Sequence, residues 1–129
     1  MFSEEIFENR LASWAAFRDK LETTDNPVQF AYKFYDKAKR HTLQCDPWDR
    51  DSWPDPWQLV EKNIYCKFTS ILGVVYSLML CNRFQNNVFS IAICQDSSGQ
   101  IDYGFSIDKK FYPNNNLQIL NTYQMSLIK

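Results

Sequence analysis

The spacing of apolar residues changes once along the chain, from a helical period to an alternating one. Phe7, Leu11, Trp14 and Leu21 recur at helical spacing while charged residues lie off that stripe, which predicts an amphipathic helix near the start. A second helix is expected from Pro27, because proline suits the first helical position. It closes in a basic segment, and cations favour the negative end of a helix dipole.

The segment "CDPWDRDSWPDP" predicts an irregular loop, since each of its three prolines removes a backbone donor. Its aspartates lack the glycine and the distal glutamate of a calcium-binding loop, so no calcium site is expected. A short helix should follow from Pro56, with Asp55 as its N-cap and Gln58 as the reciprocal capping side chain.

A longer helix is predicted from near Tyr65 to about Leu80. Charge is almost absent after Lys67, which indicates a helix buried on most of its sides and central to the fold. Small residues recur at positions i, i+4, i+7 and i+11 along it, and this small-residue stripe consists of Cys66, Ser70, Gly73 and Ser77.

Alternation begins at "NVFSIAICQD", and "IDYGFSIDKKFY" continues it as a second strand after the turn "DSSGQ", so a β-hairpin is expected. The segment "LQILNTYQMSLI" predicts either a last strand pair or a strand with a short tail. Helices before an antiparallel sheet indicate an α+β fold, in which the N-terminal helices and the central helix pack on the small sheet. We expect one domain over 1–129, with a helical part (1–45), the Trp/Pro loop and central helix (46–81) and antiparallel strands (86–129).

Composition narrows the classes of function. The 129 residues are 45% hydrophobic and 16% aromatic, enough for the core of one globular domain. The net charge of −1 comes from dispersed charges, so a basic nucleic-acid-binding face is not expected. The first residues do not read as a signal peptide, and no stretch reaches the ~18 apolar residues of a membrane helix. We therefore expect a cytoplasmic chain without membrane contact.

The cysteines predict free thiols in or near the core. They are widely spaced and form no C-x-x-C pair, and His41 is the only histidine, so neither a metal site nor a cofactor is expected. The four cysteines are Cys45, Cys66, Cys81 and Cys94.

The order of motifs around one cysteine resembles a known family. In "SWPDPWQLVEKNIYC", Trp53, Pro56 and Gln58 precede a cysteine that opens a buried helix, and antiparallel strands follow. This pattern resembles the bacterial transglutaminase-like cysteine peptidases, which have a papain-like fold. The resemblance covers roughly residues 30–125 and implies that Cys66 stands at the nucleophile position and Asp108 at the orienting acid position.

The chain departs from that family where catalysis needs it most. No histidine follows Cys66, and Ile64 and Tyr65 replace the family's Gly-Asp. A thiol nucleophile needs a base to take its proton, and a missing acid–base group costs ~10²–10⁴ in rate. The first hypothesis is therefore a non-catalytic protein that acts through protein–protein contacts. The small chain, with its Asn-rich C-terminal end, resembles bacteriophage proteins. This suggests a structural or assembly component of a virion, or a factor that binds a host protein in the host cytoplasm. An oligomer is left open.

Two alternatives use the same residues differently. A cysteine hydrolase or acyl-transferase would need Cys66 as nucleophile, Asp108 as orienter and His41 as an unconventional base, although His41 more simply ends a helix. A glycan or peptide binder would need the indoles exposed side by side, whereas a structural role would bury them against the helices. The indoles in question are Trp48, Trp53 and Trp57.

Overall fold

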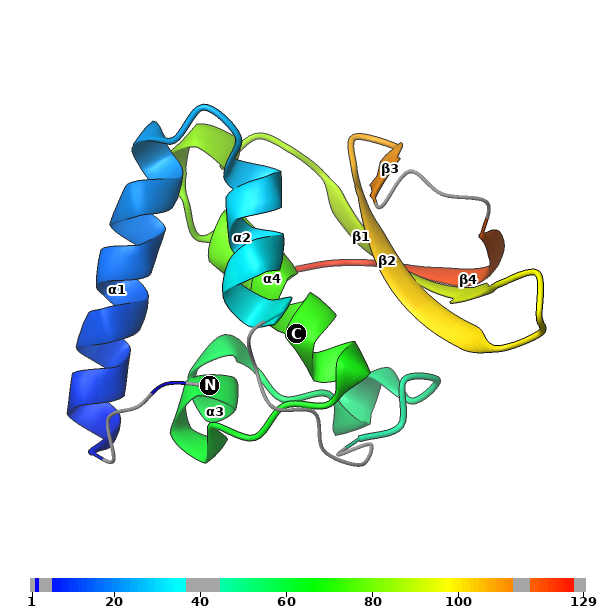
Figure 1. The fold of residues 1–129 in the computed structure, drawn as a ribbon, viewed down its shortest axis with the longest axis horizontal. Helices are drawn as coiled ribbons and strands as arrows, with labels where there is room; N and C mark the ends of the chain where they lie inside the picture. Colours follow the sequence, from blue (N-terminus) through cyan, green and yellow to red (C-terminus); the bar gives the residue numbers. More distant parts are fainter. Residues whose placement is uncertain (1, 3–5, 37–44, 113–116, 127–129) are drawn as a thin grey trace. The chain divides into compact units, whose positions relative to one another are not determined.

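The chain folds into two compact units, a helical one (1–85) and a β-sheet one (86–129). The computed structural model describes residues 2, 6–36, 45–112 and 117–126 (Figure 1). Helices precede a four-stranded antiparallel sheet, so the predicted α+β class is confirmed. The boundary between the units falls where the hydrophobic pattern changes its period. The expectation of a single domain stays a prediction, and each unit is described by itself.

The helical unit contains four α-helices and two short 3₁₀ turns among its described residues. Their bounds are α1 Phe7–Thr23, α2 Pro27–Asp36, η1 Arg50–Ser52, α3 Pro56–Lys62, α4 Lys67–Met79 and η2 Asn82–Phe84. Helices α1, α2 and α3 all pack against α4. The central position predicted for that helix is thus correct within this unit.

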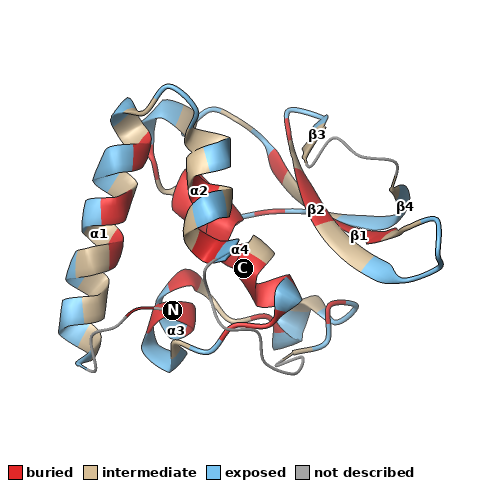
Figure 2. Cartoon of the chain, viewed as in Figure 1, coloured by how far each residue is buried: buried red, intermediate tan, exposed pale blue. Residues whose placement is uncertain are grey.

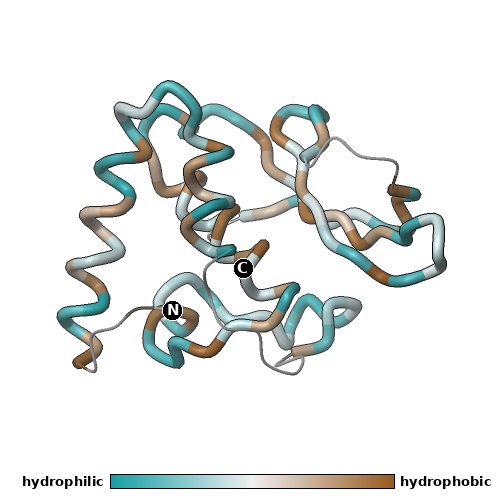
Figure 3. The backbone as a smooth tube through the Cα atoms, viewed as in Figure 1, coloured by the Kyte–Doolittle hydropathy of each residue, from teal (hydrophilic) through white to brown (hydrophobic). Residues whose placement is uncertain are grey.

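Helices α1 and α2 lie where the pattern predicts them. Hydrophilic and hydrophobic segments alternate along α1 (Figure 3), and its buried residues include the predicted Trp14 and Leu21. Phe17 completes the buried set. At the start of α2 the side-chain oxygen of Asn26 accepts the backbone N–H of Gln29 at 3.3 Å, which satisfies one of the donors that a helix leaves open.

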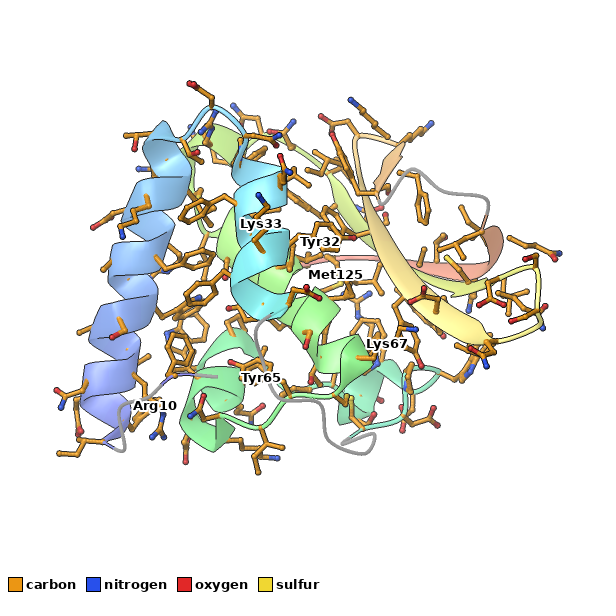
Figure 4. All side chains as sticks on the ribbon, in the orientation of Figure 1. Arg10, Tyr32, Lys33, Tyr65, Lys67 and Met125 are labelled. Carbon is orange, nitrogen blue, oxygen red and sulfur yellow. The ribbon has the colours of Figure 1, made fainter. Side chains whose placement is uncertain are left out.

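Helix α3 is held at both ends. The expected capping box is present: the Asp55 carboxylate accepts the Gln58 N–H at 2.8 Å, and Gln58 Oε1 accepts the Asp55 N–H at 2.9 Å. At the other end Arg10 of α1 (labelled in Figure 4) donates to the carbonyls of Val60 and Glu61 at 3.0 and 2.6 Å. A helix of only seven residues is marginal by itself, and these bonds at its two ends stabilise it.

Helix α4 is buried along almost its whole length (Figure 2). Its small-residue stripe receives aromatic side chains from α1 and α2. The ring of Tyr35 lies against Gly73, and the Ser77 hydroxyl accepts the indole N–H of Trp14 at 2.9 Å. The Tyr35 hydroxyl lies 3.1 Å from the same Ser77 oxygen. Small residues are therefore required here so that α1 and α2 can approach.

The sheet unit has the strand order β3-β2-β1-β4. Its strands are β1 Phe89–Gln95, β2 Ile101–Ile107, β3 Lys110–Tyr112 and β4 Gln118–Gln124. The predicted hairpin is the antiparallel pair of β1 and β2. The last segment forms one strand with a short tail, since β4 pairs with the far side of β1 rather than with β3.

One strand prediction is wrong. The segment "IDYGFSIDKKFY" was expected to run as one strand, but a two-residue turn divides it into β2 and β3. The turn residues Asp108 and Lys109 have φ of 50° and 73°, in the left-handed region. Such a turn usually contains Asn-Gly or Asp-Gly. Because neither turn position here is glycine, the sequence does not predict the turn.

The two faces of the sheet carry side chains of different kinds. Alternation and register place Phe89, Ile91 and Ile93 of β1 on one face with Phe105 and Ile107 of β2, and all five are buried. The opposite face, here called the serine face, consists of smaller and more polar residues, namely Ser90, Ala92, Cys94, Gly104, Ser106 and Gln124. Strand β4 is exposed at six of its seven positions.

Candidate functional site

Cys66 is the N-cap of α4 rather than an open nucleophile. Its side chain is 2% exposed, and its sulfur accepts the backbone N–H of Thr69 at 3.4 Å. Thr69 Oγ1 in turn accepts the Cys66 N–H at 2.8 Å, which completes a capping box. The Ser70 hydroxyl donates to the Cys66 carbonyl at 2.9 Å. The thiol thus helps to begin the central helix, and a substrate would have to displace its surroundings to reach it.

Asp108 lies in the turn between β2 and β3, not on a strand, and it is exposed. Its carboxylate accepts the Val88 N–H at 2.8 Å and the amide of Asn87 at 2.5 Å. These two bonds hold the pKa of the Asp108 carboxyl below its ordinary value. The carboxylate is therefore ionised and fixed in place by two residues of its own unit.

The remaining catalytic candidate, His41, lies outside the described residues. All four cysteines are free thiols, as expected. Burial raises the pKa of Cys45 and of Cys81 to about 11, which keeps both protonated at neutral pH.

In the described part of the chain no three His, Cys, Asp or Glu side chains gather as metal ligands would. No helix in that part is long and apolar enough to cross a membrane.

The three indoles of the Trp/Pro loop and α3 divide into one buried and two exposed. Trp53 is 3% exposed, its ring contacts that of Phe68 edge-on at 5.1 Å, and its N–H donates to the Asp46 carbonyl at 3.2 Å. Trp53 is therefore not available as a binding residue, and its prediction as one is wrong. Trp48 and Trp57 are 51% and 48% exposed, so Trp48 does not pack into the core as its structural interpretation expected.

The loop that carries Trp48 is ordered by its own polar groups. The Asp46 carboxylate accepts the Trp48 N–H at 2.9 Å, and the Ser52 hydroxyl donates to the Asp49 carbonyl at 2.7 Å. The buried Trp53 also anchors this loop, through its contact with Phe68 and its bond to the Asp46 carbonyl. Trp48 therefore stands on a constrained backbone. Rigid aromatic side chains of this kind lose little conformational entropy on binding.

A hollow on the serine face is a feature that sequence reasoning missed. It has a volume of about 360 Å³ and is lined by Val88, Ser90, Ser106, Asp108, Lys109 and Gln124. Ser106, Ser90 and Gln124 stand side by side across β2, β1 and β4, because Ser90 pairs with both of the others. These three residues become neighbours only through the register of the three strands. No local sequence motif predicts that register.

Comparison with known proteins yields no counterpart: no family model, no curated protein and no solved structure matches this chain. The geometry of its own residues is therefore the basis on which a function is assigned.

Proposed function

We propose that this chain is a non-catalytic binding protein that acts through protein–protein contacts, with Trp48 and Trp57 as the anchors of its contact surface. The observation that carries the proposal is their exposure: two large indoles within ten residues of each other are each about half exposed. Tryptophan is enriched among the residues that dominate protein–protein binding energy. Isolated exposed apolar residues are ordinary, but one indole on an anchored loop and another on the helix that follows it favour a recognition surface.

The state of Cys66 supports the absence of turnover. Nucleophilic catalysis by a thiol needs an accessible sulfur and a base within hydrogen-bond reach. The Cys66 sulfur is buried, and its hydrogen-bond partners among the described residues are the backbone N–H and the hydroxyl of Thr69. Threonine is not a base near neutral pH, so this pair serves the helix end and not proton transfer.

The proposal includes a scaffold of the transglutaminase-like type from which catalysis has been lost, on the strength of the Trp53, Pro56, Gln58 and Cys66 pattern. It also includes a bacteriophage origin, with a virion component or a host-protein-binding factor as the role. Both rest on the sequence, whereas the contact surface rests on the exposed indoles.

Site-directed photocrosslinking tests the contact surface. A benzophenone amino acid is placed at position 48 or 57, and at exposed Lys67 of the same unit as the matched control. Irradiation in the source cell should yield one discrete protein adduct from positions 48 and 57 and none from position 67. Adducts of equal strength at all three positions would show that the indoles do not mark the contact surface.

A double variant, Trp48→Ala with Trp57→Ala, tests the same surface by loss of binding. Because both side chains are half exposed, we expect the fold to persist and the adduct partner to be lost. A glycan array probed with the parent chain and this variant separates the other class of ligand. Glycan binding that depends on the two indoles would replace the protein-binding proposal.

A further inference from the structure

The hollow on the serine face combines opposite charges with neutral hydrogen-bonding groups. Lys109 and Asp108, whose side chains carry opposite charges, both line the hollow, so the charges of its lining residues sum to zero. The hydroxyls of Ser90 and Ser106 can each donate and accept a hydrogen bond, and the Gln124 amide can do the same. Most of the surface that lines the hollow is nevertheless apolar. Such a mixture suits a small ligand that carries both charges.

The carboxylate of this hollow is pre-organised. Asp108 is held by the Val88 N–H and by the Asn87 amide, and its own N–H donates to the Val88 carbonyl at 2.8 Å. Each carboxylate oxygen accepts only one of those bonds, which leaves further acceptor positions on both. A ligand ammonium could bind there without the cost of ordering the side chain.

The ammonium comes from the adjacent residue of the same strained turn. Lys109 has φ of 73°, a conformation that non-glycine residues seldom adopt. Such strain is often retained where a side chain has a task, and the inference runs from the observed outlier to a function. A glycine at this position would relieve the strain but would remove the cation from the hollow.

We propose that the hollow binds a small zwitterion, an α-amino acid, whose ammonium pairs with Asp108 and whose carboxylate pairs with Lys109. The hydroxyls of Ser90 and Ser106 then hydrogen-bond the remaining lone pairs and protons of the ligand. A volume of about 360 Å³ stands at the small end of ligand sites and has room for a free amino acid. This site lies in the sheet unit, so it is independent of the indole surface proposed above.

Amide chemical shifts of the full-length chain, titrated with L-alanine, test the proposal. Saturable shifts should appear at Val88, Ser90, Ser106 and Gln124, and they should weaken as salt screens the charges. Acetate and methylammonium, which each carry one of the two charges, should bind at least about threefold more weakly than L-alanine. Equal binding of acetate and L-alanine would overturn the zwitterion assignment, and so would the absence of saturable shifts in the hollow.

Two lysine variants separate the role of the hollow from the stability of the fold. Lys109→Gly should raise the melting temperature and yet weaken L-alanine binding at least about threefold. Lys110→Gln removes the same charge from the next position, which does not line the hollow, and should leave the affinity unchanged. L-alanine binding that survives Lys109→Gly, or that falls equally in Lys110→Gln, would refute the proposal.

Discussion

The ring of Tyr35 on α2 lies over Gly73 of α4, in the space where any other residue would place its β-carbon. A β-carbon at Gly73 would stand 2.7 Å from Cζ and 2.9 Å from Cδ1 of that ring. Real β-carbons essentially never approach other heavy atoms so closely, so the glycine allows α2 and α4 to meet. The same tyrosine bonds to Ser77, one turn further along α4.

Gly73→Ala should therefore destabilise the helical unit. In an exposed helix this change would stabilise by about 0.5–1 kcal/mol, because alanine has the better helix propensity. Here overpacking against Tyr35 should cost about 1–3 kcal/mol, and the steric term decides the sign. Urea denaturation measures the difference, and the double variant with Tyr35→Leu should lose less stability than the sum of the two single changes. A Gly73→Ala protein more stable than the parent would contradict this packing.

Two buried tyrosines should respond in opposite ways to loss of the hydroxyl. Tyr35→Phe removes the bond to Ser77 and should cost about 1 kcal/mol. The Tyr65 hydroxyl is buried and has no hydrogen-bond partner among the described residues. Tyr65→Phe should therefore leave the stability unchanged or raise it by about 1 kcal/mol. Paired denaturation curves test this contrast, and a larger loss in Tyr65→Phe than in Tyr35→Phe would reverse the assignment.

Stability should fall as the solution becomes alkaline. Burial raises the pKa of Cys81 from 9.0 to about 11 and that of Tyr35 from 10.0 to about 12. The folded state then holds these protons more tightly, so above pH 9 the unfolded state binds fewer protons and the free energy of unfolding decreases with pH. The contribution of the thiol is fully present below pH 9 and lost as pH rises through about 11.

Urea midpoints at half-unit steps from pH 8 to 11 measure this decline. Cys81→Ala should flatten the slope between pH 9 and 11, because the titrating thiol is gone. A midpoint that is constant across that range, or a slope unaffected by the substitution, would show that the thiol gains no protection from folding.

The turn between β2 and β3 should accept glycine. A left-handed conformation costs a non-glycine residue about 1–2 kcal/mol, so Lys109→Gly should recover about 1 kcal/mol in the sheet unit. Lys110→Gly, at the first residue of β3, is the matched control and should destabilise. Thermal melting distinguishes the two variants, and a lower melting temperature for Lys109→Gly would indicate that its side chain holds the turn together.

Cys66 should resist alkylation until the helical unit opens. With the sulfur buried at the start of α4, modification should accelerate steeply with added urea. Half-buried Cys45 should be modified earlier in the same sample, and mass spectrometry assigns each site. Rapid alkylation of Cys66 in native buffer would restore it as a nucleophile.

Local signals predicted the fold better than they predicted the site. The capping box of Asp55 and Gln58 could be read directly, because both partners lie within four residues and the motif has one geometry. The turn at Asp108 and Lys109 could not, since neither residue is the glycine that such a turn usually holds. Local chemistry thus identifies an element only where the residue types are specific to it.

Burial of the individual tryptophans depends on distant contacts and could not be predicted. Trp48 and Trp53 stand in similar Asp/Pro surroundings, yet Trp53 is buried with its ring against that of Phe68 on α4, whereas Trp48 is half exposed. The hollow has the same origin, because Ser90, Ser106 and Gln124 come together through strand register across three strands. Sequence patterns predicted the hairpin strands and the last strand but not which polar residues would become neighbours.

The position of β4 has a consequence for how the sheet unit opens. This strand joins the sheet at its edge, pairs only with β1 among the described strands, and is exposed at six of seven positions. Detachment of β4 exposes little buried apolar area to water, and β1 remains paired with β2. Amide protons of β4 should therefore exchange with solvent by local fraying, well before those at the centre of β1, which await opening of the whole hairpin.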